Sequence, residues 1–266
     1  MRVIDLNNNT GFEQKLYPDN QPHIIVTGVE PGEPVKVIVS LTSSLKVVHL
    51  LQVTNALEHL DARKEVLIIP YLMAARFDRI MQHGDSFDLE VISDLINQCN
   101  FKKVILFDVH SDVAIRLIKN SVSISNRELV ERYSMPNAIV ICPDAGASRK
   151  VKNYLDWNEN LEEIIYCEKK RNLSDGKLSL EVIEPEKCEN RNCVIIDDIC
   201  DGGATFLAIA EQIRTSHLTL IVTHGIFSKG FSSLEKAFDK IIVSNSYNQN
   251  YNAKKVETIQ LDFKKF

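Results

Sequence analysis

The sequence has no stretch of about 18 consecutive apolar residues, so it predicts no membrane-spanning helix. It also lacks low-complexity segments and blocks of like charge, and Met1–Thr10 does not have the basic-then-apolar pattern of a signal peptide. The 31 Lys and Arg residues are outnumbered by 36 Asp and Glu, which gives a net charge of −5 and argues against nucleic acid as the main partner. We therefore expect a cytoplasmic protein that binds neither a membrane nor a nucleic acid.

Cysteine is sparse and scattered, with six residues and no C-x-x-C pair. Cys99, Cys142 and Cys193 adjoin apolar, strand-like runs, where reduced and buried thiols are the usual state. The Cys and His residues show none of the spacings of a zinc site. Neither a disulfide framework nor a zinc centre is expected.

Short apolar runs alternate with helical patterns along the 266 residues, of which 44% are hydrophobic. Continuous β-branched runs are typical of strands covered on both faces, so the alternation predicts an α/β protein with mostly parallel sheets. The expected strands are 23–29, 35–41, 66–70, 104–108, 138–142, 163–167, 192–197, 218–224 and 240–244. The expected helices are 47–60, 88–99, 111–119, 126–133, 148–155, 204–214 and 231–238.

These strands are too many for one small sheet, so we expect two tandem doubly wound domains, residues 1–132 and 133–266. No linker marks the join, which we place near 121–133. The polar stretch Arg171–Lys177 predicts a mobile loop.

One stretch combines two adjacent acids with a Gly-Gly turn. Asp197 and Asp198 close an apolar run, and Gly202-Gly203 precedes a helical pattern. A helix start presents unpaired backbone N–H groups that favour anions, and the acids offer acceptors for hydroxyl groups. Phosphate at one end and carboxylates at the other suit a sugar phosphate. The alternative is an ordinary strand-to-helix turn with capping acids.

Polar clusters follow three further predicted strands. They are Ala74–Arg79, Asp108–Ser111 and Pro143–Gly146, and they combine carboxylate, imidazole and guanidinium groups. Ligands of open α/β sheets bind outside the carboxyl ends of the strands. Together the clusters predict a binding site, although each alone is compatible with ordinary loop polarity.

From Tyr17 to Ser228 the chain resembles the ribose-phosphate pyrophosphokinases, also called phosphoribosyl pyrophosphate synthetases. The resemblance rests on motifs that occur in the family's order. They are Pro70–Arg79, Phe107–His110, Pro143–Gly146, Glu168–Arg171, Asp197–Thr205 and Thr223–Ser228.

The resemblance implies Mg²⁺-dependent transfer of the diphosphoryl group of ATP to the C1 hydroxyl of ribose 5-phosphate, giving phosphoribosyl pyrophosphate and AMP. It also implies two domains of the type I phosphoribosyltransferase kind, the N-terminal one on the ATP side and the C-terminal one on the ribose-phosphate side. The implied ATP-binding residues are Tyr17, Asp19, Gln21, Arg76, Asp78, Arg79 and His110. The implied ribose-phosphate-binding residues are Asp197, Asp198, Asp201, Gly202, Gly203, Ala204 and Thr205.

The resemblance assigns the remaining roles as follows. Lys169 and Arg171 would close over the transferring group and neutralise its charge. His110 and Asp144 would hold Mg²⁺, with direct contact between His110 and a phosphate oxygen as the alternative. The loop at Tyr17 matches one that reaches a neighbouring subunit in the family, which implies a homo-oligomer, a dimer or larger.

The phosphate loop departs from the family's usual Asp-Thr-Gly-Gly-Thr, since Gly202 stands in place of the first Thr. A lost hydrogen bond to a charged acceptor costs roughly 1.5–3 kcal/mol. Gly202 also suggests room for a larger 5-substituted ribose such as ADP-ribose. A phosphoribosyltransferase and a non-catalytic regulator on the same fold are the further alternatives. The residues Arg76, Asp78, Arg79 and His110 argue against the first, and the presence of Lys169, Arg171, His110 and Asp144 argues against the second.

Overall fold

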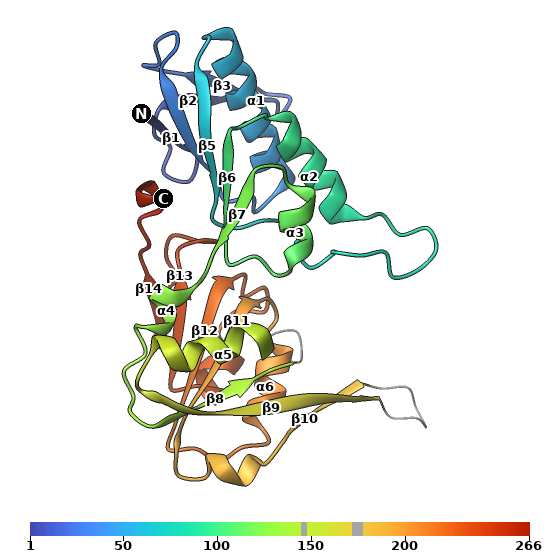
Figure 1. The fold of residues 1–266 in the computed structure, drawn as a ribbon, viewed down its shortest axis with the longest axis vertical. Coiled ribbons are helices and arrows are strands. Elements are labelled where there is room, and N and C mark those ends of the chain that lie inside the picture. The colour runs from blue at the N-terminus through green and yellow to red at the C-terminus, as the bar shows by residue number, and fades with distance from the viewer. Residues whose placement is uncertain (145–147, 172–177) are drawn as a thin grey trace. The chain divides into compact units, whose positions relative to one another are not determined.

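The computed structural model describes residues 1–144, 148–171 and 178–266, which form two units (Figure 1). The first unit comprises Met1–Ser125 together with Asp262–Phe266, and the second comprises Asn126–Leu261. The sequence predicted a division between residues 132 and 133 and gave no sign that the last residues join the first unit.

The first unit is built on a parallel sheet. In spatial order its strands are β1 (Arg2–Asp5), β4 (Pro34–Ile38), β5 (Arg63–Ile69), β6 (Lys103–Phe107) and β7 (Ser121–Ile124). Its helices are α1 (Ser44–His59), α2 (Asp88–Gln98) and α3 (Asp112–Leu117). Successive parallel strands in spatial order require right-handed crossovers, which carry the helices over one face of the sheet.

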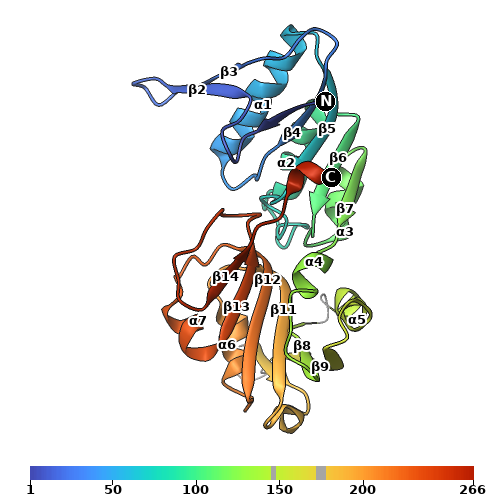
Figure 2. The same ribbon diagram turned by 90° about the vertical axis from the view of Figure 1, so that its left-hand side faces the viewer.

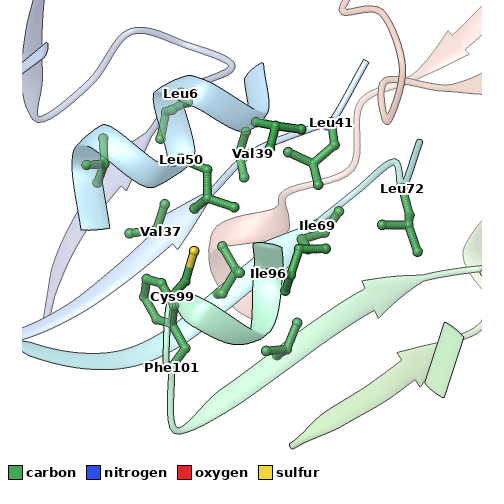
Figure 3. Packing of buried hydrophobic residues seen from close by; sticks show 14 of the residues in the cluster. Leu6, Val37, Val39, Leu41, Leu50, Ile69, Leu72, Ile96, Cys99 and Phe101 are labelled. Atoms are coloured by element: carbon green, nitrogen blue, oxygen red, sulfur yellow. The ribbon is translucent and has the colours of Figure 1, made fainter. Parts of the chain in front are cut away.

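The core of this unit lies between that face and the helices (Figure 3). Val37 and Val39 project from the same side of β4 and its continuation, because side chains alternate along a strand. They pack with Leu50 of α1, Ile69 of β5 and Ile96 of α2, all of them buried. The apolar periodicity of the sequence therefore corresponds to a real packed layer.

The opposite face is partly covered by the segment 262–266, which includes a 3₁₀ turn at Phe263–Lys265. The buried Lys36 ammonium donates hydrogen bonds to the carbonyl oxygens of Lys264 at 2.9 Å and Phe266 at 2.7 Å. The rings of Phe107 and Phe263 meet edge to face, with centroids 5.5 Å apart. A lysine in mid-strand thus satisfies its buried donors with carbonyl groups far away in the sequence.

A separate antiparallel hairpin, β2 (Phe12–Leu16) and β3 (Pro22–Val26), is inserted between β1 and β4. The Gln52 side chain of α1 donates a hydrogen bond to the carbonyl oxygen of Pro22 at 2.7 Å. The hairpin is therefore attached along α1, and its five-residue turn extends from the unit (Figure 2).

The second unit contains a larger mixed sheet. In spatial order its strands are β10 (Leu178–Val182), β9 (Leu161–Arg171), β8 (Ala138–Cys142), β11 (Asn192–Cys200), β12 (His217–Gly225), β13 (Lys240–Ser244) and β14 (Val256–Ile259). Neighbouring strands are parallel except for β9 and β10. The helices are α4 (Arg127–Val130), α5 (Ser148–Trp157), α6 (Ala204–Ala210) and α7 (Ser232–Ala237), with a 3₁₀ turn at Pro185–Cys188.

The strand order of this unit reverses direction between β8 and β11. From β8 the chain passes through α5 to β9 on one side, and it later returns to β11 on the other side of β8. Right-handed crossovers in opposite directions place α5 on one face and α6 with α7 on the other (Figure 2). This reversal is the kind of topological switch point at which open α/β sheets bind ligands.

Every strand and helix expected from the sequence is present, most of them with shifted ends, and the prediction of an α/β fold with mostly parallel sheets is confirmed. The strands β1, β2, β7, β10 and β14 were missed. The predicted loop Arg171–Lys177 was wrong at its first residue, which ends β9, and residues 172–177 lie outside the described part of the chain.

Candidate active site

The carboxyl edge of the second sheet brings together acids from the two strands of the switch point. Ile141 of β8 pairs with Ile195 of β11, so Asp144, two residues beyond β8, follows at about the level of Asp198. Asp197 is close enough to Asp144 for the two carboxyl groups to repel each other. We call Asp144, Asp197 and Asp198 the acidic cluster.

The two adjacent acids are in different surroundings. Burial raises the pKa of the Asp197 carboxyl well above its ordinary value, and the charges of Asp198 and Asp144 add to this effect. The backbone N–H of Asp198 donates to Oδ1 of Asp197 at 2.8 Å. The Asp198 side chain is only 8% exposed and has the Lys150 ammonium 3.6 Å from Oδ2. The pair therefore places a carboxyl with a raised pKa beside a second carboxyl group that lies close to a cation, which suits neighbouring sugar hydroxyls.

The loop Asp201–Thr205 connects this edge to α6. Gly203 has a φ of +78°, and a Cβ atom on it would lie 2.9 Å from Cδ2 of Leu234, so glycine is needed there. Ala204 and Thr205 begin the helix and are exposed. Their backbone N–H groups and the Thr205 hydroxyl are the donors that the sequence assigned to a phosphate.

The space next to Gly202 is occupied. A Cβ atom on Gly202 would lie 3.2 Å from Cδ and 3.3 Å from Cε of Lys229. The methylene groups of Lys229 lie beside Gly202 in this structure, so a larger 5-substituent there would have to displace them, and that alternative stays a prediction.

In the first unit, the edge of the neighbouring strands β5 and β6 carries the other predicted cluster. Arg79 Nε donates to Oδ1 of Asp78 at 2.9 Å, and the Arg79 side chain is 71% exposed. Partial burial acts to raise the pKa of Asp78, but Arg79, Ser111 and His110 lower it, and the net shift is downward. His110 thus lies near Asp78. We call Arg76, Asp78, Arg79 and His110 the arginine cluster.

The arginine cluster presents its cations outward. Arg76 is exposed, like Arg79, and it follows a tight turn in which Ala74 has a φ of +61°. Guanidinium groups held at a surface by a short turn can bind the oxygens of a polyphosphate in pairs.

Tyr17, Asp19 and Gln21 lie together in the turn of the β2–β3 hairpin. The N–H of Tyr17 donates to the carbonyl oxygen of Gln21 at 3.0 Å, and the N–H of Gln21 donates to Oδ1 of Asp19 at 3.2 Å. The Tyr17 side chain is exposed and lies near His23, with ring centroids 6.2 Å apart. The turn is ordered by its own hydrogen bonds and leaves an aromatic ring available for stacking.

The basic residues Lys169 and Arg171 lie near the end of β9, where they pair in register with Leu180 and Leu178 of β10. Their side chains lie outside the part of the structure that is described, as do Ala145 and Gly146 of the Pro143–Gly146 motif. Their roles stay predictions from the resemblance.

Sequence reasoning missed Lys150 and Lys229. Lys150 comes six residues after Asp144, and Lys229 comes just after the Thr223–Ser228 motif, but no local pattern gives a lysine a partner in another strand. Sequence reasoning also assigned no role to His224, whose Nδ1 lies 2.7 Å from Oγ of Ser246 in the buried interior. That histidine supports the sheet edge from within.

Metal binding depends on the acids of this edge. Within the described residues, no group of three or more His, Cys, Asp or Glu side chains is arranged to hold a metal ion. Magnesium usually takes one or two carboxylates, with water and substrate phosphates as its other ligands. The adjacent carboxyl groups of Asp144 and Asp197 fit that need, whereas the imidazole of His110 does not.

No described helix is both long enough and apolar enough to cross a membrane. The chain matches none of the protein-family models with which it was compared.

Curated relatives and one solved structure match most of the chain. A ribose-phosphate pyrophosphokinase of Thermococcus kodakarensis is 24% identical over 248 residues, which cover 88% of this chain and 85% of that protein. One from Mycoplasma pneumoniae is 28% identical over 215 residues, which cover 75% of this chain and 64% of that protein. The crystal structure of phosphoribosylpyrophosphate synthetase from Mycobacterium smegmatis superposes with a TM-score of 0.80 at 17% identity, covering 94% of this chain and 85% of that one.

Proposed function

The chain belongs to the ribose-phosphate pyrophosphokinase family and is an enzyme of the diphosphotransferase type, and we propose that it makes phosphoribosyl pyrophosphate and AMP from ATP and ribose 5-phosphate. The observation that carries this proposal is the contrast between its two strand edges. One unit holds the acidic cluster, and the other holds the arginine cluster.

In the proposed reaction the C1 hydroxyl oxygen of the ribose attacks the β-phosphorus of ATP. The bond from the β-phosphorus to the oxygen that bridges to the α-phosphorus breaks, AMP leaves with that oxygen and its electron pair, and the hydroxyl proton is released. Such a transfer depends mainly on alignment and on stabilising the charge of the transferring group.

The acidic cluster would hold the sugar. A carboxylate accepts hydrogen bonds from ribose hydroxyls, and Asp198 would do so beside the Lys150 ammonium, whose positive charge favours the ionised carboxylate. Asp197, with its raised pKa, would complete the hydroxyl contacts as acceptor or donor. The loop Asp201–Thr205 would take the 5-phosphate.

The arginine cluster would hold the nucleotide. Arg76 and Arg79 would bind the phosphates of ATP, with Asp78 fixing the Arg79 guanidinium through the 2.9 Å contact. His110 would contact a phosphate oxygen. The turn with Tyr17, Asp19 and Gln21 would bind adenine, in this chain's own site or in that of a second copy in a homo-oligomer.

Two further contributions complete the proposal. Asp144 would hold Mg²⁺, which when bound supplies positive charge to the phosphate oxygens of ATP. Lys169 and Arg171 would close over the transferring group and stabilise the negative charge that develops on it.

The test is to incubate the protein with ATP, Mg²⁺ and ribose 5-phosphate and to measure AMP, ADP and phosphoribosyl pyrophosphate together. We expect AMP and phosphoribosyl pyrophosphate in equal amounts. ADP in place of AMP would show single phosphoryl transfer and refute the proposal. A parallel reaction with ADP-ribose tests the larger acceptor, and turnover with that acceptor alone would replace ribose 5-phosphate in the proposal.

A further inference from the structure

The segment 226–230, which follows β12, is fastened to the segment that leads into the phosphate loop. The N–H groups of Ile226 and Phe227 donate to the carbonyl oxygen of Cys200 at 2.8 and 3.1 Å. The N–H of Ser228 donates to the carbonyl oxygen of Asp201 at 3.2 Å. The backbone just before Lys229 is therefore fixed beside Gly202.

A tight turn directs this segment. Phe227 is buried with a φ of +50°, and the N–H of Gly230 donates to its carbonyl oxygen at 2.8 Å. The Lys229 side chain then lies along Gly202, with Cγ, Cδ and Cε at 3.5, 3.2 and 3.3 Å from the place of a Cβ atom. Because Cε is already there, the ammonium group ends beside the Asp201–Thr205 loop.

The acidic side chains near the Asp201–Thr205 loop would oppose the binding of a phosphate unless a cation lies close by. Asp201 lies in the loop and Asp198 lies three residues before it, and a phosphate bound beside these acids would be repelled. Lys150 is already paired with Asp198. Lys229 makes no ion pair with any residue that the structure describes, so its charge is available to a ligand.

We propose that the Lys229 ammonium binds the 5-phosphate of the acceptor sugar and replaces the hydroxyl that Gly202 lacks. The proposal rests on the proposed function, because it takes a 5-phosphorylated ribose as the ligand. Glycine at 202 then serves a purpose, since it lets the lysine methylenes lie against the loop backbone.

The test is direct binding of ribose 5-phosphate, measured by calorimetry without ATP. Lys229→Met keeps the methylene groups and removes the charge. Lys254→Met is the matched control, because it changes the net charge equally at an exposed position before β14, near the opposite edge of the parallel strands. Circular dichroism of both variants checks that they are folded.

We expect Lys229→Met to weaken binding by about tenfold to a hundredfold, as the loss of a charge-assisted hydrogen bond does, and Lys229→Arg to restore most of it. Lys254→Met should bind like the unchanged protein. Equal binding by Lys229→Met and the unchanged protein would overturn the inference, and so would no binding by the unchanged protein. Weakened binding by Lys229→Met in a protein that makes no AMP would retain the inference and refute the proposed reaction.

Discussion

The acidic cluster and the arginine cluster both lie at carboxyl edges of parallel strands, yet they differ in burial and charge. In the second unit, three carboxyl groups that are buried or half-buried crowd together, and one of them has a strongly raised pKa. In the first unit, a single carboxylate with a lowered pKa holds an exposed guanidinium. The same strand-edge position can thus be surrounded by different side chains, which suit sugar hydroxyls in the proposed role of the acidic cluster and phosphate groups in that of the arginine cluster.

The largest expected effect comes from a residue that would act on the transferring group instead of holding either substrate. Lys169→Ala should lower kcat by about 10²–10³ and change both KM values little, because it removes charge stabilisation that is needed mainly in the transition state. The measurement is AMP release at saturating ATP and ribose 5-phosphate.

Lys170→Ala is the control for this variant, because it removes the same charge at the neighbouring position of the sequence. It should retain kcat within about threefold, the spread expected when no catalytic contact is lost. Near-normal kcat in Lys169→Ala would remove that residue from the proposed mechanism.

The contrast between the clusters predicts opposite KM effects for two matched variants. Asp198→Asn should raise the KM for ribose 5-phosphate by about tenfold to a hundredfold and leave the KM for ATP nearly unchanged. Asp78→Asn should raise the KM for ATP and leave the KM for ribose 5-phosphate nearly unchanged. Its effect should be weaker, because Arg79 is largely exposed and keeps its charge. If both variants shift the same KM, the assignment of one substrate to each cluster is wrong.

Stability should also respond to pH in opposite directions at the two clusters. The pKa of Asp197 is raised on folding, so protonated Asp197 favours the folded state at low pH, and this contribution is lost as pH rises through the folded pKa. Asp197→Asn should therefore be more stable than the unchanged protein at pH 7, by about 0.5–2 kcal/mol, and the difference should shrink toward pH 4.

The pKa of Asp78 is lowered on folding, so its ionised form favours the folded state above the ordinary carboxyl pKa, and this contribution is lost as pH falls. Asp78→Asn should be slightly less stable at pH 7 and equal to the unchanged protein in acid. Thermal unfolding of both variants from pH 4 to pH 8 measures the two trends. Parallel trends would contradict the contrast in burial.

The sequence revealed those features in which local pattern and tertiary role agree. The run Val194–Ile196 followed by Asp197 and Asp198 predicts a buried strand with acids at its end. The structure has the buried strand, but the strand continues past both acids to Cys200. Strands such as β7 and β14 have only four residues each, and their pairing partners supply the stability that their own sequence does not show.

Other features were beyond sequence reasoning because they depend on contacts between distant segments. Lys150 of α5 is paired with Asp198 of β11, Lys229 lies on Gly202 after a turn, and Lys36 donates to the carbonyl groups of residues 264 and 266. A lysine has no periodic signature, so its partner becomes visible only when the chain is folded. The switch point between β8 and β11 likewise follows from strand order, which no local pattern specifies.

The two glycines of the Asp201–Thr205 loop should respond differently to an added side chain, and the smallest effect is expected at Gly202. A Cβ atom on Gly203 meets Leu234 at 2.9 Å in a left-handed backbone, so Gly203→Ala should cost about 1–3 kcal/mol of stability. A Cβ atom on Gly202 meets only the flexible methylenes of Lys229, which can shift.

Gly202→Thr should therefore fold normally and change the affinity for ribose 5-phosphate by no more than about threefold, because the added hydroxyl and the displaced ammonium have opposing effects of similar size, about 1.5–3 kcal/mol each. Calorimetry and thermal unfolding of both glycine variants measure this difference. A large gain in affinity for Gly202→Thr would show that Lys229 does not replace the missing hydroxyl, and a large loss of stability would show that the lysine cannot move aside.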